Sequence, residues 1–264
     1  MSMSIVTISF NQATFLVEAI ESVLATAKST DLELILIDPG STDGSREIIL
    51  EYAKCDDRVR YLFENDLGPA DGLNKGFGLA RKDYIGYINS DDYYLPGAIE
   101  EVDKLFNSNS EIAVLIGHGL KLQNKKFRIV VSDNFNAKAY AYERCNFLQQ
   151  STFYNRDILQ SLKVEFNIHN RTCWDGEFLF DIALRHGKFK TIPRLWGVFR
   201  IHENSISGTG KLNDIYRDDR KRMTQRYFCE TGVFQKSQFN FIFKTYRALL
   251  RRVKKAIIYA RRDA

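Results

Sequence analysis

The sequence has few of the residues on which secreted, disulfide-stabilised proteins depend. Its 4 cysteines are widely spaced along 264 residues and form no C-x-x-C pair. Because disulfide frameworks and thiolate zinc sites need cysteines at suitable spacings, we expect reduced thiols that mainly pack. Only 4 prolines and 16 glycines are present, and 44% of the residues are hydrophobic. This composition predicts an ordered, globular chain.

Long apolar runs and a secretory leader are also missing. No stretch approaches the roughly 20 apolar residues that a membrane-spanning helix requires. The chain enters a strand-like segment at residues 4–10 without the basic start and cleavage site of a signal peptide. We therefore expect a cytoplasmic protein with one sizeable domain, or one domain and an appendage.

Several common catalytic and phosphate-binding signatures are absent. The sequence contains no G-x-x-x-x-G-K-[ST], no H-E-x-x-H and no G-x-S-x-G. Residues 76–78 (GFG) lack the third glycine of G-x-G-x-x-G. Without a glycine-rich cradle, the binding of a pyrophosphate would depend more strongly on a metal ion.

The charge is distributed unevenly along the chain. The formal net charge is +5, yet residues 211–264 hold 15 Lys and Arg against 5 Asp and Glu, which leaves residues 1–210 net negative. Apolar residues recur at helical spacing between residues 239 and 257, with basic residues largely off that stripe. We expect a catalytic domain at 1–210 and a basic amphipathic helical tail at 211–264.

The first 90 residues alternate between strand-like and helix-like patterns. Strands are predicted at 4–10, 32–37, 59–63 and 84–88, and helices at 11–27, 45–53 and 72–81. Such alternation predicts an α/β fold with a parallel sheet and helices on both faces. Further along, the patterns predict strands at 112–116, 127–131 and 196–201, a helix at 175–186, and helical structure from 214 onward.

Polar clusters follow three of the predicted parallel strands, at residues 9–11, 38–43 and 89–92. In open α/β sheets, ligands bind beyond the carboxyl ends of the strands. The convergence of three strand ends predicts one nucleotide-type crevice.

Asp91 and Asp92 are adjacent carboxylates at one of these ends, and their charges repel each other. A divalent cation would relieve that repulsion, and oxygen ligands favour Mg²⁺ or Mn²⁺. Such an ion could bridge a diphosphate and neutralise a leaving nucleotide diphosphate. The alternative is a turn in which the aspartates cap the next helix, whose first turn is set by Pro96.

Taken together, seven segments in order resemble the inverting family 2 of glycosyltransferases, which has the GT-A fold, and in particular its members that build bacterial surface polysaccharides. They are SIVTISFN at 4–11, IDPGSTDGS at 37–45, DLGPADGLNKG at 66–76, INSDDYYLPGA at 88–98, QQSTF at 149–153, WDGEF at 174–178 and FRIHENSIS at 199–207. The resemblance implies a Rossmann-like nucleotide-sugar-binding half at 1–110 and an acceptor half at 111–210.

The resemblance also implies roles for particular residues. Asp92 would be the main metal ligand, Asp91 would contact ribose or metal, and His202 would bind metal or diphosphate. Asp175 would be the general base, with Glu177 as the second candidate. The nucleotide-sugar pocket would be formed by Ser9, Asn11, Asp38, Asp71, Asn74, Lys75, Asn89 and Asp91.

Several of these residues also have plain structural interpretations. Asn74 and Lys75 could complete a helix turn, Asp175 could cap a helix, and a single histidine such as His202 is often structural. Two positions depart from the family pattern. Pro39 stands where many relatives have an Asp that touches the base, and Asn89 replaces the first Asp of D-x-D.

The predicted activity is a metal-dependent hexosyl-type transfer from a nucleotide-diphosphate donor, with UDP-sugar favoured, to a glycan or lipid-linked acceptor. Alternatives are a sugar-phosphate nucleotidyltransferase, which should show a glycine-rich segment after the first strand, and an inactive nucleotide-sugar-binding protein. The tail at 239–262 could lie on an anionic membrane on the cytoplasmic side, pack on the catalytic domain, or contact another subunit. No nucleic-acid-binding module accompanies its charge, so nucleic acid is not expected as a partner.

Overall fold

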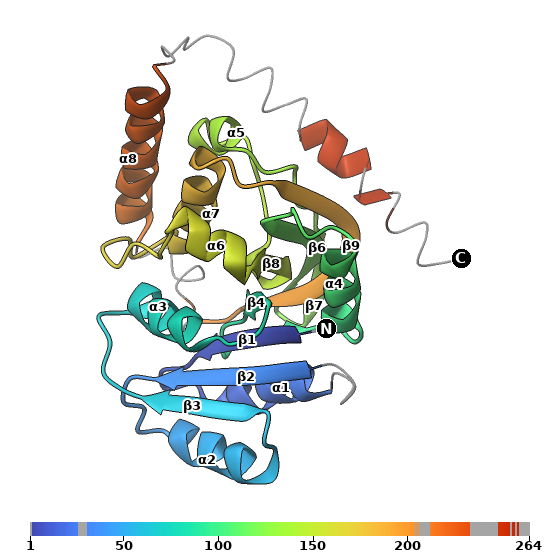
Figure 1. Cartoon of the computed structure of the whole chain (residues 1–264), viewed down its shortest axis with the longest axis vertical. Coiled ribbons are helices and arrows are strands. Elements are labelled where there is room, and N and C mark those ends of the chain that lie inside the picture. The colour runs from blue at the N-terminus through green and yellow to red at the C-terminus, as the bar shows by residue number, and fades with distance from the viewer. Residues whose placement is uncertain are drawn as a thin grey trace.

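The computed structural model describes residues 2–25, 31–203, 205, 212–232, 248–253, 255, 256 and 258. These residues build one mixed sheet of nine strands between two layers of helices (Figure 1). The strand order is β3-β2-β1-β4-β8-β6-β9-β5, and β7 pairs with β6.

The amino-terminal part of the sheet is parallel. It consists of β1 (Ser2–Ile8), β2 (Asp31–Asp38), β3 (Val59–Phe63) and β4 (Tyr84–Tyr87). β1 is flanked by β2 and β4, and β2 also pairs with β3. Nearly every residue of β1 and β2 is buried because helices cover both faces, which explains why most of their residues are apolar.

The second part of the sheet is mostly antiparallel. It contains β5 (Tyr93–Tyr94), β6 (Val114–Gln123), β7 (Lys126–Val130), β8 (Thr152–Asn155) and β9 (Phe189–Ile201). β8 joins the two parts by pairing antiparallel with both β4 and β6. β9 runs parallel to β6, and this pairing delivers the end of β9 to the loop after β4.

Helices cover the two faces of the sheet in separate groups. α1 (Ala13–Leu24), α2 (Ser45–Cys55) and α4 (Ala98–Asn107) pack on one face. The other face carries α3 (Pro69–Leu79), α5 (Ala137–Ala141), α6 (Arg156–Leu162), α7 (Trp174–Leu184) and α8 (Asn213–Thr231). A short 3₁₀ turn, η1 (Gln149–Ser151), precedes β8. Successive side chains of β1 point to opposite faces of the sheet, so Ile5 packs with the first group of helices and Val6 with the second.

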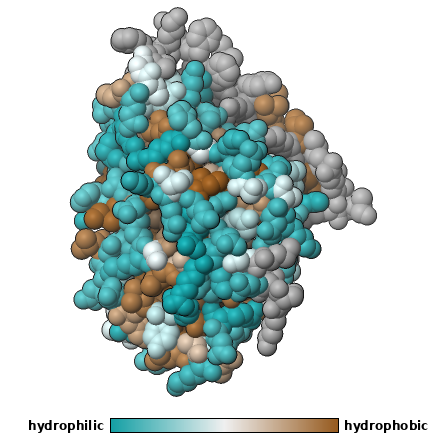
Figure 2. Space-filling model, in the orientation of Figure 1, coloured by the Kyte–Doolittle hydropathy of each residue, from teal (hydrophilic) through white to brown (hydrophobic). Residues whose placement is uncertain are grey.

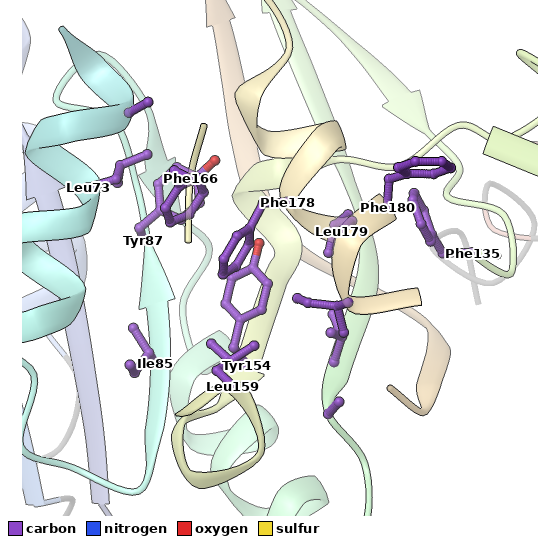
Figure 3. Packing of buried hydrophobic residues seen from close by; sticks show 14 of the residues in the cluster. Leu73, Ile85, Tyr87, Phe135, Tyr154, Leu159, Phe166, Phe178, Leu179 and Phe180 are labelled. Carbon is purple, nitrogen blue, oxygen red and sulfur yellow. The ribbon is translucent and has the colours of Figure 1, made fainter. Parts of the chain in front are cut away.

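An aromatic cluster fills the core between α3 and α7 (Figure 3). The rings of Phe166 and Phe178 stack with centroids 4.0 Å apart, and Tyr87 and Tyr154 pack around them. Phe166 belongs to the segment 163–173 that leads into α7. The cluster therefore fixes this segment against the parallel part of the sheet.

The predicted alternation and the α/β class are confirmed, with shifted boundaries. α3 begins at Pro69, because proline at the first helical position has no N–H that needs a partner. β9 begins at Phe189, seven residues before the predicted strand. α8 ends before Gly232, which has a positive φ of 66°.

The predicted stripe at 239–257 falls mostly outside the described residues. Of that region, the structure describes a helical segment at 248–253 and the residues 255, 256 and 258. None of the described helices is long and apolar enough to cross a membrane. Apolar residues on the face shown in Figure 2 form several separate patches among hydrophilic ones.

Candidate active site

A cavity of about 990 Å³ lies at the carboxyl ends of β1, β2 and β4. Its lining includes Ser9, Pro39, Asn89 and Asp91 from these strand ends, and Asp175 from the first turn of α7. The parallel register brings the three strand ends to one edge of the sheet, as the sequence predicts. α7 also borders the cavity, and the pattern of strands in the sequence did not predict the position of this helix.

Asn11 and Asp38 organise the loops at this edge. The Asn11 backbone N–H donates to Ser41 Oγ at 2.8 Å, and Asn11 Oδ1 accepts from the Thr42 N–H at 2.9 Å. Asp38 Oδ1 accepts from the N–H groups of Gly40 and Ser41 and from Arg46 Nε. Burial alone would raise the pKa of Asp38, but these hydrogen bonds outweigh it and lower the pKa.

Several buried polar atoms at or next to the cavity have no hydrogen-bond partner among the described residues. Three of them are Ser9 Oγ, Asp38 Oδ2 and Asn89 Oδ1. All three belong to the residues predicted to bind the nucleotide-sugar. Because buried polar atoms in folded proteins are nearly always hydrogen-bonded, unpaired atoms at one crevice indicate a place for a polar ligand.

Asp91 lines the cavity and contacts His202, which is not itself a lining residue. His202 Nε2 lies 3.0 Å from Asp91 Oδ2, and each side chain is 17% exposed. His202 directly follows β9, and its ring also packs on Phe15 of α1 with centroids 4.7 Å apart. The two residues are 111 positions apart in sequence and are brought together by the parallel pairing of β9 with β6 and the short pairing of β5 with β9.

Asp92 does not line the cavity. It is 1% exposed, and it accepts hydrogen bonds from Gln150 Nε2 at 2.6 Å and from the Arg200 backbone N–H at 2.7 Å. Burial and the neighbouring charge of Asp91 raise its pKa well above the ordinary value, against the effect of these hydrogen bonds. The structure therefore places Asp92 as a buried link between η1 and β9.

Asp175 lies in the first turn of α7 and lines the cavity. Burial raises its pKa to about 6, although a hydrogen bond from the Gly176 N–H, at 2.7 Å, opposes the shift. A carboxylate that titrates near neutrality is suited to accept a proton from a hydroxyl. Glu177, in contrast, is 1% exposed and is paired with Arg222 of α8 instead of lining the cavity.

The predicted pocket residues of α3 lie outside the cavity lining. Asn74 exchanges two hydrogen bonds of 2.8 Å with the backbone of Phe166. Asp71 accepts from the Leu67 N–H, and Lys75 Nζ donates to the backbone oxygen of Asn65 at 2.5 Å. These three side chains hold the segments next to the cavity.

Two contributions were not foreseen from the sequence. Asp66, the first residue of the DLGPADGLNKG segment, lines the cavity, and burial raises its pKa. The sequence could have indicated it, because Asp66 is the first acidic residue of a segment that resembles the family. Gln150 was assigned to the acceptor-side segment, and its hydrogen bond to Asp92 requires the tertiary fold.

Comparisons with known proteins agree with this geometry. Residues 4–167 match Glycosyl transferase family 2. An uncharacterized glycosyltransferase of Nostoc sp. is 24% identical over 76% of this chain and 65% of its own length. The uncharacterized glycosyltransferase EpsJ of Bacillus subtilis is 25% identical over 77% of this chain. The chain thus spans less than two thirds of the length of these two relatives, 65% and 62%.

Solved structures share the fold. Residues 1–349 of TarS from S. aureus, in complex with UDP-GlcNAc, superpose with a TM-score of 0.66 at 15% identity, covering 90% of this chain and 74% of that fragment. The mannosyltransferase PcManGT of Pyrobaculum calidifontis, in complex with GDP-Man and Mn²⁺, gives 0.62 at 14% identity, covering 93% of this chain and 68% of PcManGT. This chain belongs to glycosyl transferase family 2. Its sheet and helices form the expected GT-A fold.

Proposed function

We propose that this protein transfers a sugar from a nucleotide-diphosphate donor to a hydroxyl of a glycan or lipid-linked acceptor, with inversion at the anomeric carbon. One observation carries the proposal: Asp91, beside His202, and Asp175 line the same cavity. The cavity could therefore hold a diphosphate near the first pair and a reacting hydroxyl near Asp175. Bacterial surface polysaccharide is the proposed product, in keeping with the similar protein TuaG of Bacillus subtilis, which is named a putative teichuronic acid biosynthesis glycosyltransferase.

The donor's nucleoside would lie against the ends of β1 and β2. Ser9 Oγ and Asp38 Oδ2 supply unpaired polar atoms there, and Pro39 forms part of the wall. A UDP-sugar remains the favoured donor, supported by the UDP-GlcNAc complex of TarS. The GDP-Man complex of PcManGT makes GDP-sugars the comparison to test.

Asp91 and His202 fit a divalent cation such as Mn²⁺ or Mg²⁺. The Asp91 carboxylate and the His202 imidazole, which lie 3.0 Å apart, are oxygen and nitrogen donors of the kind that would hold such an ion. No third His, Cys, Asp or Glu of the described chain completes a cluster with them, so phosphate oxygens and water would fill the shell. A cation held there would neutralise the charge of the leaving nucleotide diphosphate. Asp92, the predicted main ligand, would support Asp91 from behind.

Asp175 would act as the base. Its carboxylate would accept the proton of the acceptor hydroxyl while that oxygen bonds to the anomeric carbon. The bond from that carbon to the diphosphate breaks at the same time, and its electron pair leaves with the nucleotide diphosphate. One attack from the opposite face inverts the configuration.

Nucleotide binding provides the test. We expect UDP, with Mn²⁺ present, to raise the melting temperature more than GDP, ADP or CDP, and the rise to be absent with EDTA. Asp175→Asn should keep this rise and lose sugar transfer. Full turnover in Asp175→Asn would refute the base assignment, and no stabilisation by any nucleotide would refute the donor class.

A further inference from the structure

Helix α8 places two charged side chains against residues on either side of Asp175. Arg222 donates two parallel hydrogen bonds to Glu177, from Nη1 at 2.5 Å and from Nη2 at 2.8 Å. Asp219 Oδ2 accepts from the hydroxyl of Thr172 at 2.7 Å. α8 begins 46 residues after the end of the matched family region at 167, so the match assigns it no role.

Glu177 connects α8 to the turn before α7, because it contacts residues of both. Its carboxylate accepts from Asn170 Nδ2 at 2.7 Å and from Asn167 Nδ2 at 3.2 Å. Asn170 Oδ1 in turn accepts from the backbone N–H groups of Thr172 and Cys173. These two residues directly precede Trp174 and Asp175, so the chain of contacts ends at the cavity.

The same segment is anchored at its other end by α3. Both hydrogen bonds of Asn74 go to the backbone of Phe166, whose ring is stacked in the aromatic core. Residues 166–173 are therefore held by α3 at the start and by α8 at the end. Of these two anchors, only α8 supplies the counter-ion of the buried Glu177.

α8 itself is fixed firmly enough to act as a support. Met223 and Tyr227 are buried in the core that contains Phe178 and Phe180. The Arg220 guanidinium lies 3.8 Å from the centroid of the Tyr140 ring, and Arg220 also donates to the Tyr140 backbone oxygen. An element packed in this way can hold a neighbouring segment in one geometry.

We propose that Arg222 and Asp219 are positioning residues that act through Glu177, Asn170 and Thr172 to fix Asp175 in the cavity. The inference rests on the proposed function, in which Asp175 is the base. Displacement of a reacting group by about 1 Å can lower a rate about 100-fold, so this support would matter for turnover. Glu177 then serves as an ionised anchor: burial opposes its ionisation, but the hydrogen bonds from Arg222, Asn170 and Asn167 outweigh it and lower its pKa.

The kinetic test uses Arg222→Lys, which keeps the charge and loses the paired geometry, and Asp219→Ala, which frees the Thr172 hydroxyl. We expect kcat to fall about 10- to 100-fold in each, with the donor KM within about twofold of wild type. Arg217→Ala is the matched control on the same helix, because the exposed Arg217 contacts only Asp214 one turn away among the described residues. It should leave kcat unchanged.

A second control separates positioning from loss of stability. Arg58→Lys removes another paired arginine–carboxylate contact, with Asp56, outside the cavity lining. If Arg58→Lys and Arg222→Lys lower kcat equally at equal loss of melting temperature, the proposal is overturned. Unchanged kcat in both Arg222→Lys and Asp219→Ala overturns it as well.

Quenching of Trp174 fluorescence by acrylamide provides a readout independent of activity. Trp196 is fully buried, so the quenched signal comes from Trp174 beside Asp175. We expect stronger quenching, and faster amide hydrogen exchange at 167–175, in Arg222→Lys than in wild type. Unchanged quenching and exchange would overturn the proposal. If quenching increases in Arg222→Lys but the wild-type protein transfers no sugar, α8 does hold the segment before Asp175 in place, and the proposed function is refuted.

Discussion

The His202 imidazole and the Asp91 carboxylate lie 3.0 Å apart, although they lie in segments that follow different strands of the sheet. This contact distinguishes Asp91 from its neighbour Asp92, which faces the interior. The pair therefore leads to separate predictions for the two aspartates.

Asp91→Asn and His202→Ala should weaken Mn²⁺-dependent UDP binding at least about tenfold, because each removes one of two proposed protein ligands. Isothermal titration with and without Mn²⁺ measures the effect. His169→Ala is a suitable control, since His169 is exposed and the histidine that pairs with Asp91 is His202. Unaltered metal dependence in both site variants would contradict the assignment.

Asp92→Ala should lower stability and largely preserve nucleotide binding. The Asp92 carboxylate accepts from Gln150 and from the Arg200 backbone, so its removal leaves both donors without their acceptor. The free energy of unfolding should fall by about 1–3 kcal/mol, which lowers the melting temperature by several degrees. Loss of metal-dependent binding without loss of stability would show instead that Asp92 is the ligand.

Sugar transfer should depend on pH through Asp175. Because its pKa is raised to about 6, kcat should increase tenfold per pH unit well below pH 6 and level off above it. Measurement of kcat from pH 4.5 to 8 at saturating donor and Mn²⁺ gives the profile. A profile flat from pH 5 upward would contradict the role of a base with this pKa.

Asp175→Asn should make the protein more stable at neutral pH. The folded-state pKa of Asp175, about 6, exceeds its ordinary value of 3.8, so ionisation destabilises the folded chain as pH rises through that interval. Replacement by Asn removes this cost, about 3 kcal/mol above pH 6. Melting curves of both proteins should differ at pH 7.5 and converge near pH 4; a less stable variant at pH 7.5 would contradict the prediction.

Association with an anionic membrane through the tail at 239–262 stays a prediction. In the described part of the tail, Leu249, Leu250 and Val253 are exposed, while Arg251 pairs with Asp133 of the catalytic body. Vesicles containing anionic phospholipid should sediment with the protein, and neutral vesicles should not. The triple substitution of the three exposed residues by Ser should reduce binding without affecting nucleotide affinity. Equal sedimentation with both kinds of vesicle would refute an electrostatic attachment.

The sequence by itself determined the alternating strands and helices, because buried parallel strands are mostly apolar and surface helices carry an apolar stripe. It also determined the convergence of Ser9, Asp38 and Asn89, since parallel strands end at one edge of a sheet. Asp175 could be located through the family resemblance, although its raised pKa depends on burial that no local pattern encodes.

Only the tertiary structure decided which carboxylates face the cavity. Asp91 and Asp92 are adjacent and chemically identical, and the chain direction after β4 turns one toward His202 and the other toward Gln150. Glu177 was a second candidate base by its spacing from Asp175, and Arg222, 45 residues further on, pairs with it. Contacts between residues so far apart depend on how the elements pack, and no periodicity in the sequence specifies them.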